Sequence, residues 1–460
     1  MTMQSRRDLF HAHRLMTQRA SLALLRGEPD LPDQPLRRLN VAAFSGVLVA
    51  VIVTGVFFIW GLLGHGGSSL QNQPGTLVID KQTGTPFVFC ENGKLCPVVN
   101  YASARLALGN STLNQQTVDQ SALTRFARGP LIGIPGLPQP LPTSGLLVKQ
   151  PWSVCTQTTS GPFGTQTTTA LTGGIRVGGQ PLGSSALLAT ALSQDWVIWD
   201  GRRMPIQPNM IQALHTAQVP AQVPSVWLDA LPQGPGFVPP AIPGEGSTVT
   251  GPTGAPVTVG QVYQVTSVAG STQYYVMLRH GLAPISQVQA ALLDFKPGAP
   301  NQATLSPSQV TGHLSGTSVP GNGLPSSIPA VAAPAASAPR CVVYSGGGTA
   351  LTTGQVETGG KMPSGGVPTD IPADVADVTL PPGAGALVGS DPGPGADSGV
   401  ISYFLVANGR RYALAETEVA NMLGYDLSTQ AVLLPAGVVD LIPAGPPLNP
   451  AEATRAVAGG

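Results

Sequence analysis

The stretch VAAFSGVLVAVIVTGVFFIWGLL, residues 41–63, organises the whole chain. It holds no charged residue, and its only hydroxyl side chains are Ser45 and Thr54. A helix of this length measures roughly 34 Å, which is enough to cross the ~30 Å hydrocarbon core of a bilayer with some tilt. Trp60 lies near its end, where an indole favours the headgroup level. The sequence therefore predicts one transmembrane helix over 41–63.

The charges on either side of this helix predict its orientation. Residues 1–40 hold seven arginines and four acidic residues, whereas residues 64–79 hold no lysine or arginine. The positive-inside rule then predicts a single-pass protein with a cytoplasmic N-terminus and an exported C-terminal domain. A cleaved signal peptide fits poorly, because the apolar run is long, starts late and lacks a small-x-small cleavage site.

Composition limits the classes of function. The 460 residues include 23 basic and 23 acidic side chains, so the net charge is +0 and no basic surface is available to follow phosphates. Nucleic acid is therefore excluded as a partner. With 42% hydrophobic residues the exported part can bury a core, while 57 glycines and 46 prolines predict short elements joined by many turns.

All four cysteines, Cys90, Cys96, Cys155 and Cys341, follow the predicted span. An even number of cysteines in an exported region indicates disulfides. No histidine lies near Cys90 and Cys96 at the spacing of a metal ligand. The sequence therefore predicts neither a metal site nor a cofactor.

The leader before the span, residues 1–40, predicts an amphipathic helix. Ser5 and Asp8 have the spacing of a capping box, and Gly27 with Pro29 ends the pattern. Such a helix either lies on anionic lipid or docks on a partner protein, and composition favours neither. The candidate docking residues are its apolar positions and two neighbouring arginines: Phe10, Leu15, Met16, Leu22, Leu25, Arg14 and Arg19.

Four segments of the exported part share one pattern, an aromatic strand, a glycine turn, a returning strand and a short helix. The turns are Asn92-Gly93, Asp200-Gly201, His280-Gly281 and Asn408-Gly409. The turn glycines are 108, 80 and 128 residues apart, which disfavours a regular solenoid and favours repeats inserted around a separate core. Strands for that core are expected in residues 151–177, 340–345 and 375–388. A bridge between Cys155 and Cys341 would tie its two pieces together.

The predicted fold class is a membrane-anchored α+β protein. One transmembrane helix precedes an elongated exported domain with four small strand–turn–strand–helix repeats around a disulfide-tied β-rich core. The expected boundaries are 1–40 for the leader, 41–63 for the span, 64–125 for a connector and repeat 1, 126–180 for the first core segment, 181–245 for repeat 2, 246–296 for repeat 3, 297–338 for a Pro/Ser/Gly-rich loop, 339–395 for the second core segment, 396–442 for repeat 4 and 443–460 for a flexible tail.

No catalytic motif emerges from the sequence. The six histidines are scattered among predicted turns and linkers, so no Ser-His-Asp set is credible. The glycine-rich residues 346–361 invite a phosphate-loop interpretation, which fails because Gln355 occupies the position of a required glycine. Met362 also follows Lys361 where serine or threonine is needed.

Two stretches resemble the EccB family of the actinobacterial type VII (ESX) secretion system. They are QSRRDLFHAHRLMTQRASLALLRGEPDLPDQPLRR, residues 4–38, and GKLCPVVNYASARLALG, residues 93–109. The resemblance implies an inner-membrane complex with EccC, EccD and EccE that exports WXG-type and PE/PPE proteins. It also implies four periplasmic repeats around a core held by the Cys155–Cys341 disulfide. Cys90 and Cys96 are additional to that bridge, and whether they form a second, local one is left open.

The expected function is that of a structural scaffold in this membrane complex, with the separate ATPase EccC supplying energy. We expect a homo-oligomer, a dimer through the exported domain. Two alternatives belong to other classes. Members of the family are described as ATPases, which makes a weak ATP hydrolase the first, and a cell-wall-binding periplasmic module is the second.

Overall fold

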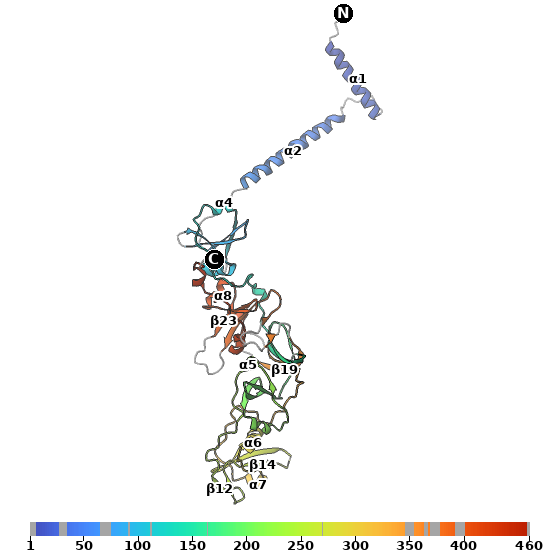
Figure 1. Ribbon diagram of the computed structural model, residues 1–460. Coiled ribbons are helices and arrows are strands. Elements are labelled where there is room, and N and C mark those ends of the chain that lie inside the picture. The colour runs from blue at the N-terminus through green and yellow to red at the C-terminus, as the bar shows by residue number, and fades with distance from the viewer. Residues whose placement is uncertain are drawn as a thin grey trace. The chain divides into compact units, whose positions relative to one another are not determined.

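The computed structural model describes residues 6–26, 35–64, 75–90, 93–110, 113–162, 164–268, 270–345, 354–362, 367–368, 378–391 and 401–457 (Figure 1). The chain divides into two units, Met1–Leu70 and Gln71–Gly460. Asn92 of the first predicted turn, the first half of the glycine-rich residues 346–361 and residues 375–377 of the predicted core lie outside the described residues.

The first unit consists of two helices, α1 (Arg6–Arg26) and α2 (Pro35–Gly64). Within α2, Leu39–Gly61 has a mean hydropathy of 2.5 and is long and apolar enough to span a membrane. The helix begins at Pro35 rather than at residue 41, which suits the preference of proline for the first helical turn. Residues 35–40, predicted to belong to the leader, therefore continue the helix that contains the candidate span.

Four sheets of the second unit have the same strand order. Their first strand pairs antiparallel with the second and parallel with the fourth, and the second pairs antiparallel with the third. We call them modules 1 to 4.

Module 1 contains β1 (Thr76–Asp80), β2 (Pro86–Phe89), β3 (Leu95–Pro97), α3 (Tyr101–Leu108) and β4 (Asn114–Val118). Module 2 contains β8 (Leu187–Ala191), β9 (Gln194–Trp199), β10 (Arg202–Ile206), η3 (Pro208–Leu214) and β11 (Ala221–Gln222). Module 3 contains β14 (Val262–Thr266), β15 (Thr272–Leu278), β16 (Gly281–Ile285), α6 (Gln287–Asp294) and β17 (Ala303–Leu305). Module 4 contains β22 (Ala386–Asp391), β23 (Ser402–Ala407), β24 (Arg410–Ala413), α8 (Glu418–Met422), α9 (Leu427–Gln430) and β25 (Ala431–Pro435).

A further sheet of seven strands, which we call the central sheet, belongs to none of the modules. Its order is β20-β6-β5-β18-β19-β7, with β21 also on β6. Cys155 of β5 lies directly opposite Cys341 of β18, and a disulfide joins them. The strands are β5 (Trp152–Gly161), β6 (Gly164–Gly173), β7 (Gly178–Pro181), β18 (Arg340–Tyr344), β19 (Gln355–Lys361), β20 (Val367–Pro368) and β21 (Val378–Thr379).

The remaining elements are short. They are α4 (Gln120–Leu123), η2 (Ser144–Leu146), α5 (Ser225–Asp229), α7 (Pro307–Val310), α10 (Ala436–Asp440), α11 (Pro450–Ala453) and the hairpin β12 (Thr248–Thr250) and β13 (Pro256–Thr258).

Several expected boundaries differ from the structure. β22, expected in the second core segment, is the first strand of module 4, because its partners are β23 and β25. β17 lies inside the expected loop 297–338, and its three residues are too few to show a strand period. The third turn is Arg279-His280, since Leu278 pairs with Gly281. The first and fourth strands of each module were absent from the predicted pattern.

The C-terminal segment is also different from the expected loose tail 443–460. Leu448 and Ala453 are fully buried, and α11 packs against α3 of module 1. Ile132 forms an isolated antiparallel bridge with Ala456. These apolar residues stand among prolines and alanines without any helix or strand period, so the sequence pattern did not reveal them.

Three hydrophobic clusters show which modules pack against one another within the second unit. One cluster joins Leu106 of module 1 to Leu405 of module 4. Another joins modules 4 and 2 to the central sheet, with Trp152 and Trp227 among its largest buried side chains. A third joins module 2 to Leu292 of module 3. The packing order is therefore 1-4-2-3, and the chain returns from module 3 to place its last module beside its first.

Candidate functional site

The predicted docking residues lie on α1. Four of the apolar side chains among them are largely exposed, with fractions of 67% for Phe10, 55% for Leu15, 73% for Met16 and 79% for Leu25. Leu22 belongs to the same helix, although its side chain lies outside the described residues. An exposed apolar helix surface is typical of a protein or membrane contact.

Helix geometry spreads these residues over a broad arc of the helix surface. Residues seven positions apart lie on nearly one line of a helix, so Leu15 and Leu22 share a face, and Arg19 borders it. Phe10 and Leu25 lie on the adjoining side of the same arc together with Arg14, while Met16 is displaced from Leu15 by about 100°. Together Phe10, Leu25, Leu22 and Leu15 span about 140° of the helix circumference, as a broad apolar stripe does, and Met16 lies outside this arc. We call the first set the Leu15 face and the second the Phe10 face.

The surface of α2 is apolar along the whole candidate span, none of which is buried within the structure. The two hydroxyls in this region bond to the helix itself. Ser45 Oγ donates to the carbonyl of Ala42 at 3.0 Å, and Thr54 Oγ1 donates to that of Ala50 at 2.7 Å. Both hydroxyls are thus satisfied without water, as a bilayer requires.

The Cys155–Cys341 disulfide is completely enclosed. Both cysteines are 0% exposed, and Val343 packs beside them. Next to Cys341 in the sheet lies Glu357, which is buried and accepts two hydrogen bonds from Arg176 at 2.9 and 3.2 Å. Because no solvent reaches the sulfurs, this disulfide is suited to a structural role and not to exchange.

The second disulfide, Cys90–Cys96, joins the ends of the β2–β3 turn in module 1. Gly129 lies against it, and a Cβ atom there would come within 2.2 Å of Cys96 Sγ. Leu95 also exchanges two backbone hydrogen bonds with Ala127 and Gly129. The disulfide and the glycine together hold β3 against the segment that follows module 1.

The described residues offer no evident catalytic or metal centre. They contain no group of three or more His, Cys, Asp or Glu side chains that could hold a metal. Lys361, the residue that invited a phosphate-loop interpretation, ends β19 and pairs with Gly178 of β7. A phosphate-loop lysine instead begins a helix.

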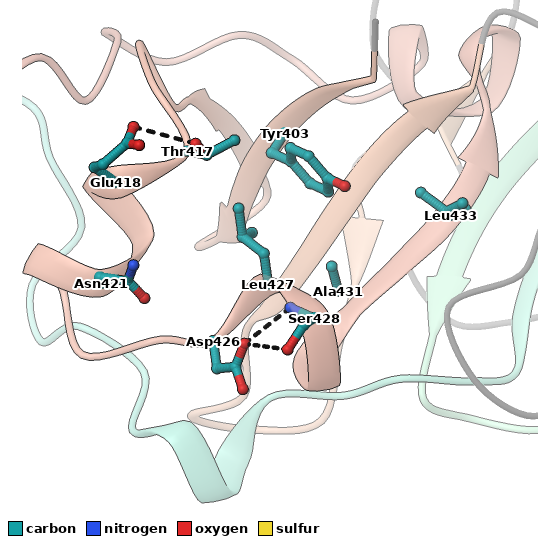
Figure 2. A pocket seen from close by; sticks show the side chains of 9 residues that line it. All are labelled: Tyr403, Thr417, Glu418, Asn421, Asp426, Leu427, Ser428, Ala431 and Leu433. Carbon is teal, nitrogen blue, oxygen red and sulfur yellow. Dashed lines mark hydrogen bonds between the residues drawn. The ribbon is translucent and has the colours of Figure 1, made fainter. Parts of the chain in front are cut away.

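A cavity of about 560 Å³ in module 4 is shown in Figure 2. Its acidic side chains are Glu418 and Asp426, and neither lysine nor arginine lines it. Asp426 accepts hydrogen bonds from Ser428 N, Ser428 Oγ and Thr429 Oγ1 at 2.7–2.9 Å, which hold the pKa of its carboxyl below the usual value. The carboxylate is thus engaged in capping α9, and a cavity of this charge is unsuited to a triphosphate.

One repeated arrangement was missed by the sequence interpretation. Arg203 of module 2 stacks on Trp196 and pairs with Asp229 of α5 at 2.5 Å. Arg411 of module 4 stacks on Phe404 and pairs with Asp440 of α10 in the same way. The signal was available, because Pro-x4-Asp-x2-Pro-x-Gly-Pro occurs at both 224–235 and 435–446. The shared motif shows that the similarity between modules 2 and 4 is not limited to their turns.

Comparisons with known proteins identify the family. A model described as "Type VII secretion system ESX-1, transport TM domain B" matches residues 3–459. The chain is 30% identical over 345 residues to "ESX-5 secretion system ATPase EccB5" of Mycobacterium tuberculosis strain H37Rv, covering 70% of this chain and 66% of the relative. It is 30% identical over 279 residues to "ESX-3 secretion system ATPase EccB3" of Mycolicibacterium smegmatis, covering 56% and 51%. The chain thus spans less than two thirds of these curated relatives.

Solved structures give the same result. The "EccB3 dimer from the ESX-3 core complex" matches with a TM-score of 0.66 and 26% identity, over 83% of this chain and 100% of that one. An "intact ESX-5 inner membrane complex" contains a chain with the same fold, at a TM-score of 0.63 and 23% identity, over 100% and 96%. Because the family model matches nearly the entire sequence, this chain belongs to the EccB family of type VII secretion systems.

Proposed function

We propose that this protein is a structural subunit of a type VII secretion complex in the inner membrane. The observation that carries the proposal is the whole-length match to a family whose solved relative is a dimer within an ESX core complex. α2 anchors the chain by a single pass, with α1 in the cytoplasm and the second unit in the periplasm, as the arginines of residues 1–40 favour. The complex exports WXG-type and related proteins.

The second unit serves assembly and carries four repeats of one module around the disulfide-tied sheet. The shared strand order of the modules supports this arrangement. Two copies associate through this unit, which has the fold of the EccB3 chain that forms a dimer in the ESX-3 core complex. A rigid unit closed by Cys155–Cys341 suits a scaffold, since it holds docking surfaces in fixed positions.

α1 is the element that connects the protein to its cytoplasmic neighbours, of the EccC and EccD type, with EccE completing the complex. α2 alone anchors the chain essentially irreversibly, so a second helix is not needed for anchoring. Pro29 and Pro32 stand between the sequences of α1 and α2. The exposed apolar side chains of α1 remain available for a protein contact.

Extraction of the full-length protein with mild detergent tests this proposal. The expected result is recovery of the other secretion subunits with the tagged chain, and loss of export when the chain is deleted. A protease added to spheroplasts should digest the second unit and spare a tag at Met1. The scaffold role would be refuted if the chain is recovered alone while the other subunits form a complex without it.

Hydrolysis of ATP is the second candidate function, because the curated relatives are named ATPases. We expect the purified chain to show no turnover above that of buffer, since no described cavity gathers several basic side chains. Lys361→Ala should leave the rate unchanged. ATP turnover that disappears in Lys361→Ala would instead establish that the protein is an enzyme.

A glycan-binding module is the third candidate class of function. Retention of the protein on purified cell wall tests it.

A further inference from the structure

A row of four polar side chains crosses the central sheet. The strand register places Arg340 of β18 between Thr358 of β19 and Thr156 of β5. Thr156 in turn lies opposite Thr169 of β6. Residues directly opposite each other on paired strands point to the same face of a sheet, so all four side chains share one face. We call these four residues the polar row.

The polar row borders an apolar part of the same face. The neighbouring row consists of Val356, Val342, Val154 and Leu171. All four belong to the hydrophobic cluster that joins the central sheet to modules 2 and 4. Arg340 beside them is only 4% exposed, and burial lowers the pKa of its guanidinium. The charge of Arg340 is therefore held where little water can solvate it.

Only backbone carbonyls hold this guanidinium among the described residues. Arg340 Nη1 donates to the carbonyls of Ala336 and Ala338 at 3.4 and 3.3 Å, in the turn before β18. Nε is buried without a hydrogen-bond partner in the described part of the chain. None of the acidic side chains that the structure describes pairs with Arg340. The carbonyls thus fix the plane of the guanidinium and leave its other N–H groups available.

A second buried donor lies across the polar row. Thr169 is 2% exposed, and its Oγ1 has no hydrogen-bond partner within the described ranges. Thr156 lies between Thr169 and Arg340, and its own hydroxyl donates to the carbonyl of Thr168 at 3.2 Å. The strands on either side of Thr156 are about 10 Å apart, because neighbouring strands are ~4.8 Å apart. Thr156 is thus flanked by two side chains whose donors lack an acceptor among the described residues.

Both donors point to an acceptor with negative charge. Native proteins pair nearly all buried polar groups, and burying a charge without a partner strongly opposes folding. A neutral acceptor such as water would satisfy the hydroxyl but would leave the charge of Arg340 uncompensated. An oxyanion satisfies both requirements, because two of its oxygens accept parallel hydrogen bonds from a guanidinium while its charge balances that of the arginine.

We propose that Arg340 and Thr169 bind a small oxyanion, a free carboxylate or phosphate ion, over Thr156. Nε and Nη2 of Arg340 donate to two of its oxygens, and Thr169 Oγ1 donates to one of them. The bound ion connects β18 to β6 across β5, beside the Cys155–Cys341 disulfide that joins β5 to β18. A free ion suits this site better than a protein partner, because Arg340 is nearly enclosed. The ion therefore stabilises the sheet on which modules 2 and 4 pack.

Thermal melts of the full-length protein in mild detergent test this proposal. After dialysis into chloride, replacing chloride by acetate or phosphate at constant ionic strength should raise Tm by about 2–5 °C and then saturate, because only the folded chain binds the ion. Stabilisation by exclusion of salts from the protein surface does not saturate, which separates it from binding. Arg340→Lys keeps the charge but cannot donate to two oxygens in parallel, so it should lose most of the response.

Two threonines of β6 give a matched pair of variants. Thr169→Val removes the hydroxyl but keeps the shape of the side chain, and it should raise the half-saturating ion concentration at least about fivefold. Thr172→Val makes the same change at another buried hydroxyl without a partner among the described residues. Thr172 points to the opposite face of β6, because side chains alternate along a strand. This control should respond to the ion as the wild type does.

The proposal is overturned by a wild type that does not respond, by a response that does not saturate, or by equal responses of Thr169→Val and the wild type. Asp370, Asp374 and Asp377 lie outside the described residues and allow a further check. If only their joint exchange for asparagine makes the chain responsive, a carboxylate of the chain itself occupies the site and the proposal fails. These melts use the isolated chain, so their outcome does not bear on the scaffold role.

Discussion

Asp294 ends α6, the helix through which module 3 packs against η3 of module 2. Its Oδ1 is buried without a hydrogen-bond partner among the described residues, and burial raises the pKa of this carboxyl to about 6. The nearest charged side chain along the chain, Lys296, is engaged with Glu245. An ionised carboxylate at this position therefore opposes the packing of modules 2 and 3.

Asp294→Asn should stabilise the protein in a pH-dependent way. The folded state binds this proton more tightly than the unfolded state, so the unfolding free energy of the wild type falls as pH rises from about 4 to about 6. At pH 7.5 the variant should be more stable by about 1 kcal/mol, a value reduced from the full shift because the site is partly solvated. Denaturant melts at pH 4 and 7.5 check this, and an equal gain at both values would contradict it.

Arg203 illustrates how modules 2 and 4 are held by the same residue types. Its guanidinium packs on Trp196 and pairs with Asp229, and its side chain is only 20% exposed. Arg203→Ala should cost about 1–2 kcal/mol of unfolding free energy, because the stacking and the charge-assisted hydrogen bond are lost together. Arg202→Ala, at the exposed neighbouring position, is the control and should change stability by less than about 0.5 kcal/mol in thermal melts.

At the scale of elements, the two disulfides differ in the length of chain that they close. Cys155–Cys341 closes a loop with a separation of 186 residues, whereas Cys90–Cys96 closes one of six. On the chain-entropy model these loops correspond to about 5 and about 2 kcal/mol, both upper figures. Replacing Cys155 and Cys341 by alanine should thus destabilise the protein much more than replacing the other pair. Equal losses in denaturant melts would show that native packing, and not loop closure, dominates.

The two faces of α1 allow a directed test of docking. Leu15→Asp with Leu22→Asp places charge on the Leu15 face, where burial in a protein contact would cost several kcal/mol. We expect recovery of EccC- and EccD-type subunits to fall at least tenfold, with the chain still inserted in the membrane. Phe10→Asp with Leu25→Asp makes the same change on the Phe10 face. Normal assembly by both double variants would show that α1 lies on lipid and docks on no protein.

For the whole molecule, the C-terminal segment closes the contact between modules 1 and 4. Leu448 is fully buried in the cluster that contains Leu106 and Leu405. Leu448→Ala should cost about 2–4 kcal/mol, through the lost transfer free energy and the cavity that remains. Leu192→Ala makes the same change at a side chain that is 87% exposed, and thermal melts should show almost no effect. A neutral Leu448→Ala would indicate that the segment is indeed a loose tail.

Local sequence patterns were sufficient to predict features that depend on residues close together in the chain. The uncharged stretch 41–63 predicted the candidate span because hydropathy is a sum over one helix. The turns at Asp200-Gly201 and Asn408-Gly409 could be predicted because both central residues of each turn need a positive φ, which asparagine, aspartate and glycine tolerate.

The sequence by itself determined the candidate span and the hairpin at the centre of each module, because these follow from composition and from residues close in the chain. Only the tertiary structure decided which further strands pair with these hairpins. β22 could equally have extended the central sheet, and β17 is too short to show a period. The packing order 1-4-2-3 and the burial of Leu448 likewise arise from contacts between distant segments, whose partners a local pattern does not specify.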